Sequence, residues 1–393
     1  MTIDLTTPRT APDLAAWLQA RQSRLTIGHT TTTPSGQTLD WVPIGSQTER
    51  LATPPPEDRS QVTVPDPRKP SNPVTFEIGA PGPSGHVPIL RPNLARVADT
   101  VMLKDRLSKP GGLLVNFNRT NRTPSDPDPA GYFHALSSQW VTAYGADGWL
   151  NVWDPEIDVP ASPGDDHSIS QVWLQNYQTP VLQSLEGGLT VDRGLDGDQA
   201  NHLFTFYTTT GYAIEGNDLG GYNRLEAGWI QYHPTIYPGI RVNGTSVRGS
   251  MQLELGIKYQ LFEGNWWFAV NNREAGPWIW IGYYPAHLFT GGLANQVDWV
   301  AFGGEVYSSL ARPCSSRDEM GSGRHAAAGW QEAAFQRNLH TQSNRAGAIT
   351  NFKGVPDVDV AASRCPTEQY TIDAHMNSGS PWGSYQFFGG PHS

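Results

Sequence analysis

Two glutamates are the best candidates for acid–base chemistry in this chain. Glu186 lies in Q-S-L-E-G-G-L-T-V (183–191) and Glu305 lies in V-D-W-V-A-F-G-G-E-V-Y (297–307). A carboxylate on such an apolar, strand-like segment is costly unless it is paired, solvated or used in chemistry. Each also adjoins two glycines, which let another backbone, such as a peptide substrate, approach closely. Meeting across a sandwich in an aromatic cleft, the two would form one proton donor and one base.

Other interpretations of the acids remain open on the residues alone. Glu186 and Glu305 can each be a solvated edge-strand or turn acid. Glu226 in R-L-E-A-G-W-I-Q is a rival that follows Arg224 and can pair with it. Glu254 in M-Q-L-E-L shows the alternation typical of an outward-facing strand residue, so we expect it to be exposed to solvent. Composition does not rank these four acids.

Other catalytic patterns are missing from the sequence. It holds no G-x-S-x-G elbow, no H-E-x-x-H pair and no phosphate-binding glycine loop between strand and helix, so we expect no cofactor and no metal. We interpret His202 in N-H-L-F-T-F-Y as a strand histidine. The two cysteines, Cys314 and Cys365, are either free thiols or one disulfide. A disulfide would close a loop of about 50 residues, and the chain-entropy model predicts that it would stabilise the folded state by roughly 4 kcal/mol.

Charge and hydropathy narrow the range of partners. The formal net charge is −10 and no basic cluster interrupts it, which disfavours nucleic acid and anionic membranes as partners. No apolar run approaches the roughly 18 residues needed to span a membrane. The first ten residues lack the basic and apolar regions of a secretory signal, so export uses another route, the start lies upstream, or the protein stays inside the cell.

The first third of the chain is predicted to be mixed in structure. Residues 10–25 have the apolar spacing of an amphipathic helix, and Q-T-L-D-W-V-P-I (37–44) is predicted to be a strand. From Ala52 to Pro83 the sequence is rich in Pro and Ser, which is typical of a linker. A second Pro/Asp-rich stretch places the main boundary near Pro124.

The rest of the chain is predicted to be all-β. Glycine, proline, tryptophan and tyrosine are abundant and only 16% of residues are charged, which favours many short strands joined by turns. Such strands imply an antiparallel two-sheet β-sandwich, jelly-roll-like in arrangement. Only 314–340, with G-W-Q-E-A-A-F-Q-R-N-L (329–339), is predicted to be helical. The strand-like segments are 148–153, 168–175, 202–209, 228–232, 251–259, 265–270, 278–284 and 297–302.

A series of motifs in one order resembles the neprosin family, glutamic peptidases that cleave after proline. The likeness covers roughly residues 85–393. Its motifs are S-G-H-V-P-I-L-R (84–91), S-I-S-Q-V-W (168–173), S-L-E-G-G (184–188), G-D-Q-A-N-H-L-F-T-F-Y-T-T-T-G-Y (197–212), G-Y-N (221–223), G-N-W-W (264–267), I-G-Y-Y-P-A-H-L-F (281–289), F-G-G-E-V (302–306), M-G-S-G (320–323) and W-G-S-Y-Q-F-F-G-G-P (382–391).

The resemblance ranks the acids. By motif order, the two catalytic glutamates of the family fall on Glu186 and Glu305. R-L-E-A-G-W around Glu226 copies the first catalytic motif more literally, but it sits where family members carry a cysteine-containing segment, and both of those cysteines are missing here. Leu189 replaces the tryptophan that the family's S-I-E-A-G-W motif has after its glutamate. The resemblance also implies a β-sandwich catalytic domain over 125–393 and an activation segment over 1–124.

The implied function is a secreted-type endopeptidase that cleaves proline-containing peptides or proteins on the C-terminal side of proline. In such a mechanism one carboxylate takes a proton from water while its protonated partner stabilises the oxyanion or protonates the leaving nitrogen, with a maximum rate at acid pH. We expect Gln171 to be a supporting amide, and a monomer outside the cell. The aromatic candidates for the cleft wall are Trp173, Tyr207, Trp266 and Trp267.

Two readings from other functional classes remain. Paired carboxylates and aromatic clefts also serve glycoside hydrolases, and a jelly roll can carry a glycoside-active site. A non-catalytic module can use the same tryptophans and tyrosines to stack on a glycan or a protein. The order of the family's motifs argues against both readings, whereas composition and spacing alone do not.

Overall fold

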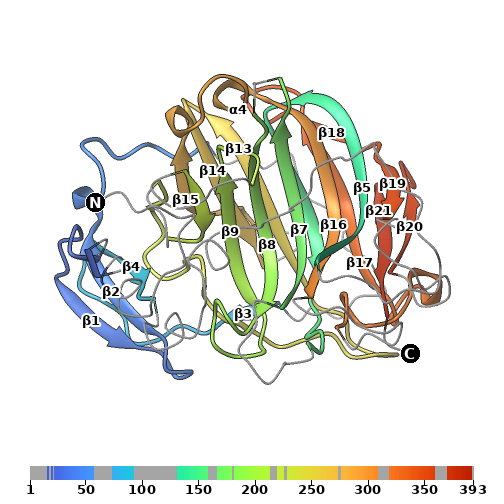
Figure 1. Cartoon of the computed structure of the whole chain (residues 1–393), viewed down its shortest axis with the longest axis horizontal. Helices are drawn as coiled ribbons and strands as arrows, with labels where there is room; N and C mark the ends of the chain where they lie inside the picture. The colour runs from blue at the N-terminus through green and yellow to red at the C-terminus, as the bar shows by residue number, and fades with distance from the viewer. Residues whose placement is uncertain are drawn as a thin grey trace.

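Two large antiparallel sheets form the body of the protein in this computed structural model (Figure 1). The structure describes residues 16, 19–20, 22–56, 73–92, 131–157, 166–178, 181–212, 219–224, 228–272, 276–308, 318–358 and 370–391. Within them the chain is mostly strand, and α4 (Gly292–Asn295) is a short helix. The predicted all-β sandwich is therefore confirmed. None of the helices described here is long and apolar enough to cross a membrane.

The first sheet has seven strands in the order β10-β9-β8-β7-β16-β5-β19. Its central strands come from distant parts of the chain, because β16 lies between β5 and β7. The strands are β5 (Gly131–Ala143), β7 (His167–Asn176), β8 (Gln183–Asp192), β9 (His202–Thr208), β10 (Gly220–Tyr222), β16 (Val297–Ser308) and β19 (Val355–Val358).

The second sheet has nine strands in the order β11-β15-β14-β13-β6-β17-β21-β20, with β18 paired to β17. It begins with local hairpins and ends with strands from the C-terminal region. The strands are β6 (Gly145–Asn151), β11 (Ile230–Gln231), β13 (Glu254–Phe262), β14 (Asn265–Asn271), β15 (Ile279–Pro285), β17 (Ala334–Gln342), β18 (Ile349–Asn351), β20 (Thr371–His375) and β21 (Tyr385–Gly389).

Alternate residues of the two sheets meet in one hydrophobic core. Successive side chains of a strand point to opposite faces, so one face of each sheet is apolar. Leu185 and Leu189 of β8 belong to the same buried cluster as Tyr259 of β13 and Phe268 of β14. Glu186 must consequently face away from this core.

The segment 329–339 is not a helix, which corrects the prediction from the sequence. Ala334–Gln342 form strand β17, paired with β6 and β21, and only Ala326–Ala328 make a single 3-10 turn (η4). Alanine, glutamine and arginine favour a helix locally, but here both flanking strands bond to the segment. Tertiary pairing overrides the local preference.

The predictions for the N-terminal region have mixed outcomes. The strand expected at 37–44 is confirmed as β2 (Thr38–Pro43). Most of the helix expected at 10–25 lies outside the described residues, although Ala16, Gln19, Ala20 and Gln22 are helical. The boundary near Pro124 and both Cys314 and Cys365 also lie outside them.

The N-terminal region packs against the body of the protein in two ways: its side chains join the main hydrophobic core, and one of its strands pairs with a strand of the body. β2 pairs with β1 (His29–Thr32) and β4 (His86–Leu90), and these strands lie at one side of the sandwich (Figure 1). Leu39 and Trp41 of β2 belong to the main core cluster. Further along, β3 (Thr75–Phe76) pairs with β12 (Val242–Asn243) of the body.

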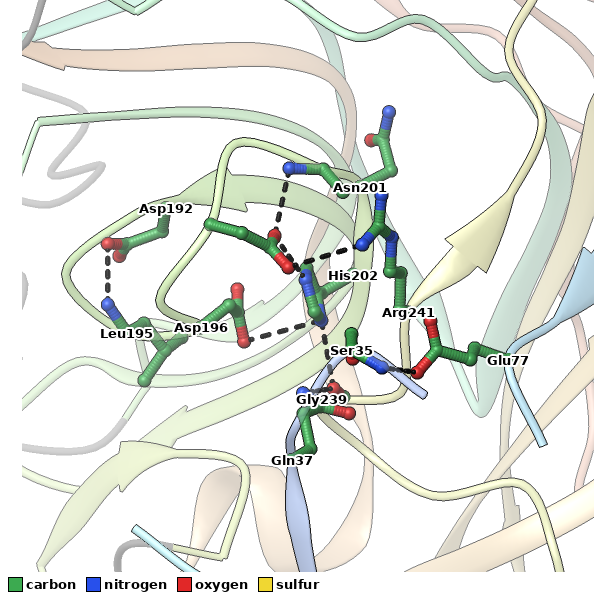
Figure 2. A network of polar contacts seen from close by, with 12 residues as sticks. Ser35, Gln37, Glu77, Asp192, Leu195, Asp196, Asn201, His202, Gly239 and Arg241 are labelled. Carbon is green, nitrogen blue, oxygen red and sulfur yellow. Dashed lines mark hydrogen bonds and ion pairs between the residues drawn. The ribbon is translucent and has the colours of Figure 1, made fainter. Parts of the chain in front are cut away.

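A buried histidine lies where this docking is most polar (Figure 2). Gly239 O accepts hydrogen bonds from Gln37 Nε2 at 2.8 Å and from the Nδ1 of His202 at 2.9 Å. The other ring nitrogen, Nε2, lies 2.9 Å from Asp198 Oδ1. Burial by itself would lower the pKa of His202, but Asp196, Asp198 and the Gly239 carbonyl together raise it to about 9. His202 is therefore a strand residue with a structural ion pair.

Candidate active site

One face of the seven-stranded sheet carries both candidate glutamates, and we call it the glutamate face. The register places Glu186 of β8 opposite Trp173 of β7, and Glu305 of β16 opposite Ile169. Trp173 and Ile169 are four residues apart, so their side chains lie on the same side of β7. The two glutamates thus stand two strands apart and two residue-pair rows apart, roughly 10 Å across and about 13 Å along the strands.

Glu186 is fully buried and held by hydroxyl groups. Its Oε1 accepts a 2.6 Å hydrogen bond from Tyr212 and a 2.9 Å hydrogen bond from Ser184. Burial, followed by the charge of Glu186 and the hydrogen bond to it, raises the pKa of Tyr212 well above its usual value. The phenol therefore keeps its proton and remains a donor to Glu186 at any acid pH.

Glu305 is also fully buried, but its neighbours are different. His134 Nε2 lies 3.2 Å from its Oε2, and His167 Nε2 lies 3.3 Å from its Oε1. Gln171 Nε2 donates a third contact, 3.3 Å from Oε2. The two imidazoles come from β5 and β7, the strands on either side of β16. The carboxylate of Glu305 is thus held between two imidazoles and one amide.

Gln171 occupies the row between the two glutamates. Its register partners are Gly188 on β8 and Gly303 on β16, so on these three strands the row has a side chain only on β7. A Cβ at Gly188 would lie 2.1 Å from Ser170 O, and one at Gly303 would lie 2.3 Å from Ala135 O. Both positions thus require glycine, which explains the second residue of the pair after Glu186 (Gly188) and the first residue of the pair before Glu305 (Gly303).

Aromatic rings border the glutamates on the same face. Trp173 lies next to Glu186 in the register, and its ring meets that of His134 at 6.2 Å in an edge-on contact. Phe206 lies across from Glu186 on β9 and stacks on Tyr212, with ring centroids 6.1 Å apart. The structure therefore places Gln171 and Trp173 on the same face as Glu186 and Glu305.

The other three aromatic candidates lie elsewhere, so they do not wall this site. Tyr207 points into the main core, where it contacts Tyr284 and Phe289. Trp266 is in the same core, and its Nε1 donates to Leu293 O. Trp267 faces the opposite side of the nine-stranded sheet, in a cluster that Leu51 joins. Strand alternation separates Trp266 from Trp267, which is why an adjacent pair cannot serve one surface.

Of the two rival acids, Glu254 and Glu226, the structure describes only Glu254. Glu254 is not exposed to solvent as expected but only 4% exposed, and Arg337 binds it through two contacts, Nε–Oε1 at 2.6 Å and Nη2–Oε2 at 2.9 Å. It does face outward from the core, but Arg337 and Trp382 cover it. Glu226 lies outside the described residues.

Several partners of the site were missed at the sequence level. Ser184 sits two residues before Glu186 on the same strand face, so strand alternation alone was a sufficient signal for it. His134, His167 and Tyr212 lie on segments far from the glutamates that they contact, and they gave no local signal. Only the register of β5, β7 and β16 brings the histidines to Glu305.

Comparison with known proteins identifies a family for this chain and a weak likeness to one solved structure. The family described as Neprosin matches residues 164–391, which is more than half of the chain and includes both glutamates. Among solved structures, a functionally unknown protein from Saccharomyces cerevisiae is similar at 8% identity, with a TM-score of 0.22. That likeness covers 44% of this chain and 64% of the yeast chain.

Proposed function

Because the chain belongs to the Neprosin family, which implies a prolyl endopeptidase, we propose that it hydrolyses peptide bonds on the C-terminal side of proline with Glu186 and Glu305. The observation that carries the proposal is a pair of buried carboxylates that face the same side of one sheet, with the amide of Gln171 in the row between them.

Glu305 acts as the base in this mechanism. It takes a proton from a water molecule, whose oxygen then attacks the scissile carbonyl carbon. The choice of Glu305 rests on its neighbours, because the ring nitrogens of His134 and His167, at 3.2 and 3.3 Å, can hold the carboxylate in a fixed orientation. The amide of Gln171, 3.3 Å from Glu305, lies beside the attacking water and can donate to the developing oxyanion.

Glu186 acts as the acid. The hydroxyls of Tyr212 and Ser184 both reach its Oε1 and orient the carboxyl group. Its proton goes to the leaving nitrogen when the carbon–nitrogen bond breaks. Since one glutamate must be ionised and the other protonated, the rate follows a bell-shaped pH profile with its maximum at acid pH.

The dyad is tested with a fluorogenic peptide that contains one proline, digested between about pH 3 and pH 5. Glu186→Gln and Glu305→Gln should each lower kcat/KM by about 10³-fold or more, since each removes a proton-transferring group. Glu332→Gln, a half-buried glutamate elsewhere on the chain, is the matched control and should retain the wild-type rate. Mass spectrometry of the products should locate the cut after proline.

Two outcomes would overturn this assignment. Cleavage at the wild-type rate by either Glu186→Gln or Glu305→Gln would rule out the dyad. Loss of activity in Glu226→Gln, with activity retained in Glu186→Gln, would move the acid to the rival motif. Hydrolysis of an oligosaccharide without any peptide cleavage would instead favour a glycosidase.

We also propose that residues 1–124 are an activation segment of the peptidase. Its support is the intimate docking of the N-terminal strands, which share core residues Leu39 and Trp41 with the body. Cleavage of such a segment would shorten the chain in acid. Gel analysis of acid-incubated wild type should then show a shortened chain that appears together with activity, whereas activity from the intact 393-residue chain would contradict the proposal.

A further inference from the structure

The glutamate face continues past Glu186 into an exposed aromatic end. The row next to Glu186 contains Trp140 of β5 opposite Trp299 of β16. Trp140 is 55% exposed, although tryptophan is among the largest apolar side chains. Its ring lies 5.1 Å from that of Tyr177, which in turn meets Trp299 at 6.3 Å. An exposed tryptophan that stacks on a half-buried tyrosine, on the side of the sheet that holds the catalytic candidates, points to ligand contact.

Tyr177 is held firmly in this position. Its backbone amide donates to both carboxylate oxygens of Asp298, at 3.0 and 3.2 Å. The adjacent Asn176 bonds through Nδ2 to Gln296 O at 3.1 Å. Both acceptors come from the chain at the start of β16. The ring that supports Trp140 is therefore fixed before any ligand arrives, which lowers the entropy cost of binding.

A chain of hydrogen bonds joins this aromatic end to Glu186. Tyr177 OH donates to Gln175 Oε1 at 2.7 Å, and Gln175 Nε2 donates to Tyr212 OH at 2.8 Å. Tyr212 OH then donates to Glu186 Oε1 at 2.6 Å. Every bond points toward the carboxylate, so the donors polarise one another in the same direction. The contacts of Tyr177 thus bear on the orientation of Glu186.

The spacing fits an extended peptide that lies across the sheet. From Gln171 to Trp140 the route crosses two strands and two rows, roughly 16 Å. A polyproline II segment rises about 3.1 Å per residue, so this corresponds to about five residues. Val355, 69% exposed on the edge strand β19 opposite Ser138, adds an apolar neighbour on the same side.

We propose that Trp140 and Tyr177 form a remote subsite that binds a proline of the substrate about five residues from the scissile bond. A proline ring offers an apolar face and no backbone donor, and proline-rich segments dock on exposed aromatic rings because the polyproline II form is already extended. The inference rests on the proposed function, and it makes proline-rich chains, rather than isolated proline sites, the preferred substrates.

The test compares two peptides that share one scissile Pro-X bond. The short peptide has two residues on each side, and the long series extends it in either direction with a proline scanned through the fourth to sixth positions. With acid-incubated full-length chain, Trp140→Ala should raise KM for the best long peptide about tenfold, the value of one aromatic contact of roughly 1.4 kcal/mol. The kinetics of the short peptide should not change.

Three further variants sharpen the result. Trp140→Phe keeps a ring and should preserve most of the advantage of the long peptide. Val247→Ala, which removes an apolar side chain 49% exposed elsewhere, should behave as wild type with both peptides. Tyr177→Phe keeps the ring but removes the donor to Gln175, so it should lower kcat a few-fold for both peptides and leave KM unchanged.

The possible failures are distinguishable. If wild type cleaves neither peptide, the proposed function is wrong. If wild type cleaves both peptides and Trp140→Ala changes neither KM, or changes both equally, the peptidase assignment stands and the remote subsite is wrong.

Discussion

Glu186 and Glu254 are both strand glutamates with almost no exposed surface, yet their surroundings differ in kind. Glu254, on the outer face of the nine-stranded sheet, is bound at both oxygens by the guanidinium of Arg337. Arg337 in turn donates to Pro381 O at 2.9 Å and lies over the ring of Trp382. The bonds described for Glu186 come instead from the neutral hydroxyls of Tyr212 and Ser184.

The contrast separates structural carboxylates from carboxylates suited to chemistry. A guanidinium keeps its proton at all relevant pH values, so Glu254 is locked as an anion and cannot exchange protons usefully. Hydroxyl donors can bond to either protonation state of a carboxyl group, and the neighbours of Glu305 are imidazoles and an amide, not a guanidinium. Burial alone therefore does not mark a catalytic acid, whereas the chemical type of the bonding partner does.

The largest effect on stability is expected from the structural glutamate. Glu254→Gln leaves the buried Arg337 without its counter-ion, which should lower the free energy of unfolding by about 3–5 kcal/mol in urea titrations. Glu186→Gln, in which hydroxyls can bond to the new amide, should change it by no more than about 1 kcal/mol.

A double variant provides the control for this prediction. Replacing both partners, with Glu254→Leu and Arg337→Met, should recover most of the lost stability because no buried charge is then left unpaired. Equal destabilisation by Glu254→Gln and Glu186→Gln would contradict the distinction between the two sites.

The second prediction concerns His202, which pairs with two carboxylates and, like Glu254, has a structural role (Figure 2). Its pKa is raised from 6.5 to about 9, so its contribution to stability is complete below pH 6.5 and is lost as the pH rises through 9. The shift corresponds to about 3 kcal/mol. His202→Gln should therefore be less stable than wild type by roughly that amount at pH 6, and the gap should close by pH 9.5 in urea unfolding.

His233 is a control of opposite sign. Burial lowers its pKa from 6.5 to about 4, so it disfavours the folded state as the pH falls through that range. His233→Gln should gain stability relative to wild type between pH 6.5 and pH 4. A difference between wild type and His202→Gln that stays constant from pH 6 to pH 9.5 would exclude the ion pair as its cause.

The His202 pair also bears on acid activation. Burial by itself would raise the pKa of Asp198, but the hydrogen bonds that its carboxylate accepts from His202 and from Ala200 N lower it from 3.8 to about 2. The ion pair between Asp198 and His202 therefore survives the pH range in which we propose catalysis. The same site joins Gln37 of the N-terminal region to Gly239 of the body. Mild acid alone should therefore leave this docking contact in place, and release of the N-terminal region requires cleavage of the chain.

The sequence predicted the elements better than the partnerships between them. Alternation and turn residues were sufficient for most strands and for the all-β class. The failure at β17 arose because Gln336 and Arg337 are helix formers whose partners are remote: Gln386 Nε2 donates to Gln336 Oε1 at 3.0 Å, and Glu254 pairs with Arg337. The exposure expected for Glu254 failed for the same reason.

The site shows the same limit. Motif order selected Glu186 and Glu305, and the structure places them on one face with Gln171 and Trp173. Tyr207, Trp266 and Trp267 were assigned to the cleft by their type, but the parity of their positions sends them to other faces. Secretion, the disulfide and the activation segment stay predictions. The residue types of a segment indicate that it forms a strand. Which side chains of neighbouring strands then meet on one face depends on the register between the strands.

The smallest effect is expected when the hydroxyl of Tyr212, which orients Glu186, is removed. Tyr212→Phe keeps the ring stacked on Phe206 but removes the donor to Glu186 and the acceptor for Gln175. One such hydrogen bond is worth about 1.4 kcal/mol, so kcat/KM should fall about tenfold, mainly through kcat, and the high-pH limb of the pH profile, which the acid controls, should move. Tyr283→Phe is the matched control, because Tyr283 lies on β15 of the other sheet and its hydroxyl accepts a hydrogen bond from Ala52 N. If the two variants have equal activity and equal pH profiles, Tyr212 is only a packing residue. A shifted profile in Tyr212→Phe alone would show that a neutral hydroxyl, where Glu254 has a guanidinium, sets the proton affinity of the catalytic face.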